Sequence, residues 1–275
     1  MKNKMNRDKI EKLVKQINAE NLIILEGAIS VLSALRSDYC EITKVILKLD
    51  LENNNTRKIV DAARFDIIEY FSYAELGIFE EMLNGENVYR LGKTHGGIIA
   101  LARKRRYLTP LELAEQAQVI AVIEGIEDPY NLGYAVRALY TQGVDGLLLP
   151  ERDFGFSESI IEKASTGTFY KMPVAVFSDK PALIELLKDR DFTLYCVNHK
   201  APPDSQAEVR DIFQVRFAER AVFIIGGEKR GISRVFLQNA DEIVRIPYAN
   251  AFSHSLAAQT AATIVAYEIH RQRRK

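Results

Sequence analysis

The chain has 275 residues and a formal net charge of zero; 47% of its residues are hydrophobic and 27% are charged. This composition is ordinary for a globular protein of one large or two modest domains, and it argues against a generic polyanion binder. No apolar run approaches the ~20 residues of a membrane-spanning helix, and no signal-peptide core follows the basic first residues. Cys40 and Cys196 stand in different halves, which argues against a disulfide framework or a cysteine metal site and favours a cytoplasmic location.

The first part of the chain, residues 1–105, is predicted to form a small α/β domain. Helix-like stretches near 5–20, 27–37, 54–65 and 72–84 alternate with short apolar runs at 42–49, 67–70 and 97–102. Residues 106–117 carry charge and Pro110, so we expect a linker there, and residues 1–104 should be removable without unfolding the remainder. Basic clusters at 103–106 and 271–275 are either solvated surface charge or phosphate contacts.

The second part, residues 118–275, alternates more regularly. Apolar runs typical of buried strands lie at 119–123, 146–149, 174–177, 193–197, 222–225 and 243–246. Helix-length stretches lie between them, near 131–142, 157–166, 180–189, 207–217 and 232–239, and a long helix is expected over 254–272. This alternation predicts an α/β fold with a largely parallel sheet and helices on both faces.

Three polar segments each follow an apolar run of this second part. They are the stretch 128–137, the glycine-rich stretch 224–233, and the pair Ile246-Pro247 with Ser255-Leu256. Because ligands bind at the carboxyl ends of strands in open α/β sheets, these segments are expected to converge on one site.

Residue patterns alone leave the chemistry of these segments open. Ile232 stands where a nucleotide-binding loop needs lysine, and the dinucleotide fingerprint is missing as well. The glycines could simply form a strand-to-helix turn, Asn131 could be a helix N-cap, and Arg137 could be an exposed helix residue. The four histidines show no triad or zinc pattern, so no metal is expected; His254 is of interest because it adjoins Ser255.

The order and content of the three segments resemble the SpoU (TrmH-like) branch of the SPOUT RNA methyltransferases. The family's N-x-G-x-x-x-R, G-x-E-x-x-G and I-P…S-L-N motifs are matched, over about residues 118–272, by Asn131, Gly133 and Arg137, then by Gly226, Gly227, Glu228 and Gly231, and finally by Ile246, Pro247, Ser255 and Leu256. Ala257 stands where the family usually has asparagine.

The resemblance implies a C-terminal trefoil-knotted fold, S-adenosylmethionine as cofactor, and a homodimer whose active sites lie at the subunit interface. It also implies methylation of a ribose 2′-hydroxyl in ribosomal or transfer RNA, with a small N-terminal domain that binds the RNA substrate. Ala257 leaves one alternative open, an RNA-binding protein that keeps the fold without catalysis. A further alternative is an RNA base methyltransferase.

The resemblance also assigns roles to individual residues. The RNA and the reaction would involve Asn131, Arg137, Glu228 and Ser255, and the cofactor pocket would be lined by Gly226, Gly227, Gly231, Ile246 and Leu256. Because arginine stays protonated in proteins, we expect Arg137 to bind a phosphate and hold the hydroxyl, and not to act as a base.

Overall fold

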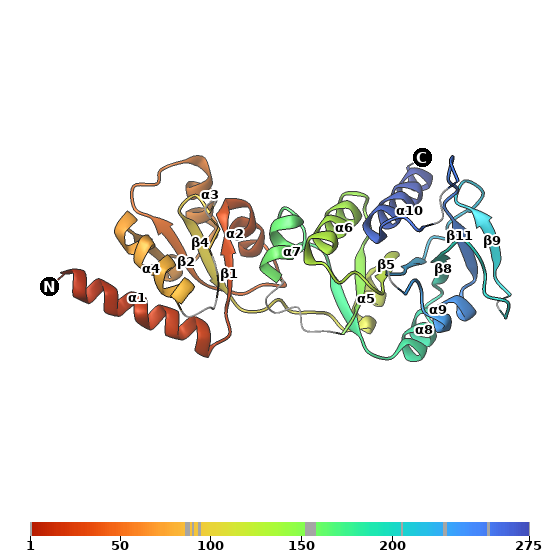
Figure 1. Cartoon of the computed structure of the whole chain (residues 1–275), viewed down its shortest axis with the longest axis horizontal. Helices are drawn as coiled ribbons and strands as arrows, with labels where there is room; N and C mark the ends of the chain where they lie inside the picture. Colours follow the sequence, from red (N-terminus) through yellow and green to blue (C-terminus); the bar gives the residue numbers. More distant parts are fainter. Residues whose placement is uncertain are drawn as a thin grey trace. The chain divides into compact units, whose positions relative to one another are not determined.

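The computed structural model describes residues 2–85, 89, 91–92, 95–151, 158–204, 206–227, 230–251 and 254–274, with the backbone alone for residues 2–5. The chain divides into two compact units, coloured by sequence in Figure 1. The first unit comprises residues 1–106 and 154–171, and the second comprises residues 107–153 and 172–275. Each unit is therefore built from two stretches of chain.

The first unit is a four-stranded sheet with helices packed against it. Its strands lie in the order β1, β4, β2, β3; β4 is antiparallel to β1 and β2, and β3 is parallel to β2. In chain order its elements are α1 (Lys2–Ala19), β1 (Ile23–Glu26), α2 (Gly27–Leu35), β2 (Ile42–Lys48), α3 (Asn54–Ala62), the 3-10 turn η1 (Phe65–Ile67), β3 (Ile68–Phe71), α4 (Tyr73–Gly85), β4 (Ile98–Ala102) and α7 (Glu158–Ala164).

Two sets of helices bury the apolar side chains of this first sheet. α1 and α4 pack together, and a core cluster joins them to the strands through Ile17, Phe79 and Ile99. α2 packs against α3, β1 and β4, and α7 packs against β1. The predicted small α/β domain is therefore present, and it contains one strand, β1, that was not among the predicted apolar runs.

The second unit contains a seven-stranded sheet in which every neighbouring pair is parallel. The strand order is β7, β6, β5, β10, β8, β11, β9. The strands are β5 (Val119–Ile123), β6 (Gly146–Pro150), β7 (Val174–Phe177), β8 (Thr193–Val197), β9 (Glu208–Asp211), β10 (Ala221–Ile225) and β11 (Glu242–Arg245). The central strands β5 and β10 are buried at every residue, as expected for strands covered on both faces.

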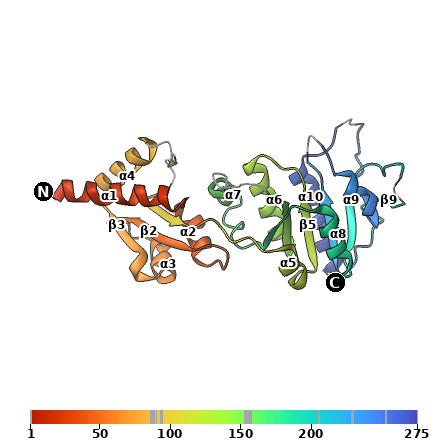
Figure 2. The ribbon, with the colours of Figure 1, turned by 90° about the horizontal axis from the view of Figure 1, so that it is seen from below.

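Helices cover this sheet in two groups. α6 (Pro129–Thr141) and α10 (Ala258–Arg273) pack on each other, and α8 (Lys180–Lys188) packs on α5 (Pro110–Gln116) and α9 (Arg234–Asn239). Figure 1 shows the first pair above the sheet, and the view from below in Figure 2 brings α5, α8 and α9 to the front. The predicted fold class is therefore confirmed.

The chain returns twice to the middle of the second sheet. β10 enters between β5 and β8, and α10 comes back from β11 to pack on α6 and β10. The trefoil knot implied by the family resemblance fits this double return.

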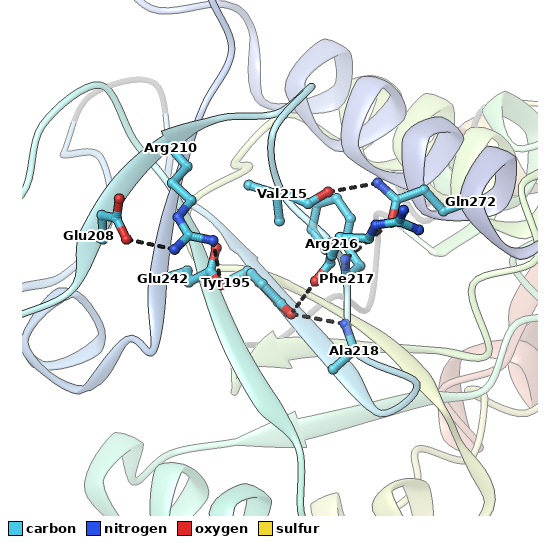
Figure 3. A network of polar contacts seen from close by, with 9 residues as sticks. All are labelled: Tyr195, Glu208, Arg210, Val215, Arg216, Phe217, Ala218, Glu242 and Gln272. Carbon is cyan, nitrogen blue, oxygen red and sulfur yellow. Dashed lines mark hydrogen bonds and ion pairs between the residues drawn. The ribbon is translucent and has the colours of Figure 1, made fainter.

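The helix predicted near 207–217 is wrong. Residues 208–211 form the edge strand β9, paired with β11, and a turn and loop follow. Figure 3 shows how contacts from distant elements hold this loop: the Tyr195 hydroxyl accepts from the backbone of Ala218 (2.9 Å), and the Gln272 side chain donates to the Val215 carbonyl (2.8 Å). These tertiary hydrogen bonds override the local helical pattern.

The stretch 106–117, expected to be a linker, contains helix α5. Thr109 caps this helix and Pro110 occupies its first turn, where the ring of proline is already compatible with the helix. Leu113 and Ala114 are buried. The charge and the proline therefore mark the start of a packed helix.

Candidate functional site

A pocket lies where β8, β10 and β11 end, at the carboxyl edge of the parallel sheet. It is lined by residues that follow these strands and by the start of α10, namely Val197, Asn198, His199, Ile225, Gly226, Gly227, Gly231, Ile232, Ile246, Tyr248, Ser255, Leu256, Ala258 and Ala261. All five residues expected to bind the cofactor are among them, together with Ser255. The structure thus brings two of the three sequence motifs together in one cavity.

The glycine loop after β10 is closed on itself. Gly227 and Gly231 exchange backbone hydrogen bonds in both directions, of 3.3 and 2.9 Å. A Cβ atom at Gly226 would lie 2.2 Å from the carbonyl carbon of Gly231, and Gly231 has a φ of +62°. Glycine is therefore required at these two positions by close approach and by left-handed backbone.

The same loop is anchored to the end of β5. A Cβ atom on Gly227 would lie 2.6 Å from the Cα atom of Gly125. Next to it, the buried Glu124 carboxylate accepts the backbone N–H of Ser233 (2.7 Å) and pairs with the Lys180 ammonium (2.7 Å). Glu124 and Gly125 were not predicted from the sequence, although their position directly after a predicted strand was an available signal.

The third motif meets the end of β8 inside the pocket. The Tyr248 hydroxyl accepts the backbone N–H of Leu256 (3.0 Å) and lies 3.0 Å from the His199 ring nitrogen Nε2. His199, one of the four histidines without a triad or zinc pattern in the sequence, lines the pocket. Cys196, in the adjoining strand, is not an available nucleophile, because burial raises the pKa of its thiol.

The first motif lies on α6. Asn131 is not the N-cap of this helix: Asp128 is, and its carboxylate accepts the Asn131 N–H (2.8 Å). The side-chain oxygen Oδ1 of Asn131 accepts from the side-chain amide of Gln259 on α10 (3.2 Å). Gln259 lies between Ala258 and Ala261, which line the pocket.

Arg137 lies apart from the pocket of its own chain. It is exposed on α6, and six residues of helix rotate it by about 120° from Asn131. No hydrogen bond or ion pair of its guanidinium is found within the described part of the chain. Glu228, the fourth residue expected at the reaction, lies outside the described residues.

The two basic clusters make contacts within the chain. Arg105 is buried and its guanidinium lies 4.5 Å from the centre of the Phe169 ring. Arg103 pairs with Glu41 (3.4 Å) and Arg271 with Glu268 (2.7 Å). These three arginines therefore have partners within the chain. Arg105 is in the interior, whereas Arg103 and Arg271 form their ion pairs at the surface.

Among the residues that the structure describes, no three His, Cys, Asp or Glu side chains gather as metal ligands would. No helix found there combines the length and the apolar character needed to cross a membrane.

Comparison with known proteins identifies the family. Residues 118–267 match the model of the SpoU rRNA Methylase family. An uncharacterized tRNA/rRNA methyltransferase of Synechocystis sp. is 32% identical over 65% of this chain, and the match spans 46% of that protein, less than half its length. A TrmH family tRNA/rRNA methyltransferase of Staphylococcus haemolyticus is 28% identical over 65% of this chain and 71% of its own length.

Solved structures share the fold along nearly the whole chain. The SpoU methyltransferase AviRb from Streptomyces viridochromogenes, in complex with AdoMet, has a TM-score of 0.71 at 18% identity and covers 97% of this chain and 98% of its own. An AdoMet-bound rRNA methyltransferase from Sinorhizobium meliloti has a TM-score of 0.73 at 17% identity, covering 98% and 95%. Since the family model matches more than half of its residues, the chain belongs to the SpoU rRNA methylase family.

Proposed function

We propose that the protein is an S-adenosylmethionine-dependent RNA methyltransferase that methylates a ribose 2′-hydroxyl in ribosomal or transfer RNA. The observation that carries this proposal is the pocket at the ends of β8, β10 and β11, where the second and third motifs meet. Membership of an RNA methylase family and the AdoMet-bound relatives support the same chemistry.

The residues of the pocket fit this cofactor. The loop at Gly226 and Gly231 exposes backbone in place of side chains, and Ile246 and Leu256 add apolar surface. These residues would hold the nucleoside and the amino-acid part of S-adenosylmethionine. S-adenosylmethionine supplies a methyl group already activated on a sulfonium, so the task left to the protein is to align the acceptor.

The acceptor side would be built by Arg137, Asn131 and Ser255. The planar, permanently charged guanidinium of Arg137 suits a backbone phosphate, and water or that phosphate would take the hydroxyl proton. The side-chain oxygen Oδ1 of Asn131 already accepts from Gln259, which leaves the side-chain amide hydrogens to donate to ribose oxygens. Ser255 lines the pocket and is exposed, so its hydroxyl is available to the ribose.

We also propose a homodimer in which Arg137 of one copy serves the pocket of the other. The packed pair α6 and α10 exposes four large aromatic side chains, Tyr130, Tyr134, Tyr140 and Tyr267. Aromatic side chains exposed on a packed helix pair are typical of a protein–protein interface. Sedimentation should show a dimer, and Tyr134→Arg should give a monomer that binds cofactor but no longer transfers methyl groups. A wild-type monomer with full activity would refute the dimer.

The first unit is proposed to bind the RNA substrate. Phe65 and Tyr73 are 88% and 81% exposed, and the Lys48 ammonium lies 5.5 Å from the centre of the Tyr73 ring. Exposed rings beside cations can stack on unpaired bases. The double variant Phe65→Ala with Tyr73→Ala should weaken RNA binding several-fold in filter binding and leave cofactor affinity unchanged in calorimetry.

We also propose a cytoplasmic site of action, which the two free cysteines support.

The decisive test of the function is Arg137→Ala. We expect a fall of about 10²–10³ in the single-turnover rate with cofactor affinity nearly intact, because the lost contact positions the acceptor. Arg137→Lys should rescue poorly, since a point charge cannot replace the planar fork. Arg216→Ala, which removes an exposed arginine elsewhere in the second unit, is the matched control. A near wild-type rate for Arg137→Ala would make this residue structural.

Two measurements separate the alternatives. An RNA-binding protein without catalysis would show no binding of S-adenosylmethionine in calorimetry. A base methyltransferase would transfer the methyl group, but nucleosides released from the product RNA would carry it on the base and not on the ribose.

A further inference from the structure

One side chain joins three of the four segments that form the pocket. Tyr248 follows β11, and its hydroxyl lies 3.0 Å from the backbone nitrogen of Leu256, at the entry to α10. It also lies 3.0 Å from Nε2 of His199, which follows β8. All three residues line the pocket, so this hydroxyl is a junction between strand ends that are far apart in sequence.

The Tyr248 hydroxyl makes two hydrogen bonds inside the pocket. The backbone N–H of Leu256 can only donate, so the Tyr248 oxygen accepts from it. The second bond joins the hydroxyl to Nε2 of His199, and its direction depends on which nitrogen of the ring carries the proton. The two rings also pack edge to face, with centres 4.8 Å apart and planes at 79°.

The bond to Leu256 closes the third-motif loop at its base. It spans eight positions of the chain, and pocket-lining residues lie at both ends of that span, with Ile246 and Tyr248 before it and Ser255 and Leu256 after it. α10 begins next to this point, and its N-cap, Ala257, forms no capping hydrogen bond. The backbone N–H of Leu256, just before α10, is therefore bonded by the Tyr248 side chain, while Ala257 itself provides no capping bond.

We propose that Tyr248 is a positioning residue that forms a clasp with His199 and so sets the shape of the cofactor pocket. The proposal rests on the proposed function, because it assigns this cavity to S-adenosylmethionine. The clasp holds the third-motif loop to the end of β8, so Ser255 and Leu256 are placed before the cofactor enters. Its effect is on binding of cofactor and not on the methyl transfer step itself.

The test is calorimetry with S-adenosylmethionine on the full chain. Tyr248→Phe leaves the Leu256 N–H and the His199 nitrogen without their partner, so the affinity should fall about tenfold. His199→Ala should lose about threefold, and the double variant should lose less than the product of the two, since the residues act as one unit. Tyr70→Phe, which removes an exposed hydroxyl from the first unit, should bind as the wild type does.

Two further readouts separate positioning from general destabilisation. His199→Gln keeps a hydrogen-bond acceptor and should recover most of the affinity lost in His199→Ala. In steady-state assays, Tyr248→Phe should raise KM for the cofactor with kcat nearly unchanged, and its melting temperature without cofactor should stay close to that of the wild type.

The outcomes discriminate between the clasp and the function. If the wild type binds S-adenosylmethionine and Tyr248→Phe binds it equally well, the clasp is refuted and the function stands. The same holds if the losses in the double variant simply multiply, or if Tyr248→Phe lowers kcat and leaves KM unchanged. If the wild type itself does not bind, the proposed function fails first.

Discussion

The two units differ in what their interiors contain. Among the described residues, eight polar or charged side chains are buried, and seven of them belong to the first unit: Ser30, Ser33, Thr56, Arg105, Glu158, Glu162 and Ser165. The second unit contributes Glu268, and its Glu124 side chain is 6% exposed. The first unit therefore buries more polar and charged side chains than the second does.

The buried charge marks the place where a distant segment joins the first unit. Glu158 accepts the backbone N–H of Arg105 (3.1 Å), and the Arg105 guanidinium donates to the Phe169 carbonyl. Glu162 accepts the backbone N–H of Tyr170 (3.3 Å). Buried charges are costly without well-placed partners, so such a network favours one way of docking residues 154–171 over others.

The second unit achieves its specificity with glycine and close backbone contact. Gly125 and Gly227 approach until a Cβ atom on either would lie within 2.6 Å of the other's backbone. The loops after β5 and β10 thus pack backbone against backbone, at a distance that only glycine allows. The two units should therefore respond differently to mutation. Replacing a buried polar side chain in the first unit can stabilise the protein, whereas adding a side chain at a close glycine contact in the second unit should destabilise it.

The largest effect is expected from removing residues 1–104. The sequence suggests a clean truncation, but Ile161, Phe169 and Tyr170 are fully buried in the first unit. Exposing them would cost several kcal/mol, so the truncated chain should aggregate. A second truncation in which a flexible linker also replaces residues 154–171 should stay soluble and bind S-adenosylmethionine. Circular dichroism melts and calorimetry compare the two truncations. If the first truncation folds well, residues 154–171 do not depend on packing against residues 1–104, and the argument is contradicted.

The contrast between the units also explains what the sequence could predict. The strands at 119–123, 174–177 and 193–197 agree with the prediction residue for residue, because strands buried on both faces are continuous apolar runs. The five residues expected at the cofactor, which came from motifs at strand ends, all line the pocket. The polar anchoring of α7, the edge strand β9 and the role of Tyr195 depend on contacts between distant segments, which leave no local pattern.

The next effect concerns the pH dependence of the first unit. Burial raises the pKa of Glu162 from 4.5 to about 8, so folding favours the protonated carboxyl. The stability contributed by this group is complete below pH 4.5 and is lost as pH rises toward 8, by at most a few kcal/mol. Glu162→Gln carries no charge, so it should match the wild type near pH 5 and exceed it in unfolding free energy near pH 8.

Denaturant unfolding at several pH values measures this difference. Glu185→Gln, an exposed glutamate on α8 of the second unit, is the control and should show no such divergence. A wild type that gains stability relative to Glu162→Gln as the pH rises would mean that Glu162 is ionised in the folded protein, with Arg105 outweighing its burial.

A matched pair of glycine substitutions tests the second half of the comparison. In Gly125→Ala the new Cβ would lie 2.5 Å from the Gly227 Cα atom, so a loss of about 1–3 kcal/mol and weaker cofactor binding are expected. Gly77→Ala lies within α4 with nothing within 4 Å of the new atom, and it should stabilise the protein by about 0.5–1 kcal/mol. Thermal melts of both variants would contradict the close-approach argument if they moved in the same direction.

The smallest expected effect is a gain from Ala257→Asn in the second unit. Ala257 is the N-cap of α10 with φ −57° and ψ 141° and no side-chain hydrogen bond. Asparagine at this extended position would accept a free N–H of the first turn and add about 1 kcal/mol, or about 2 °C in melting temperature. Ala257→Val, which offers no acceptor, is the control. If both variants melt alike, the corner is already satisfied by Tyr248. If asparagine stabilises the protein but also weakens cofactor binding, the small residue is kept for the pocket, since its neighbour Ala258 lines that cavity.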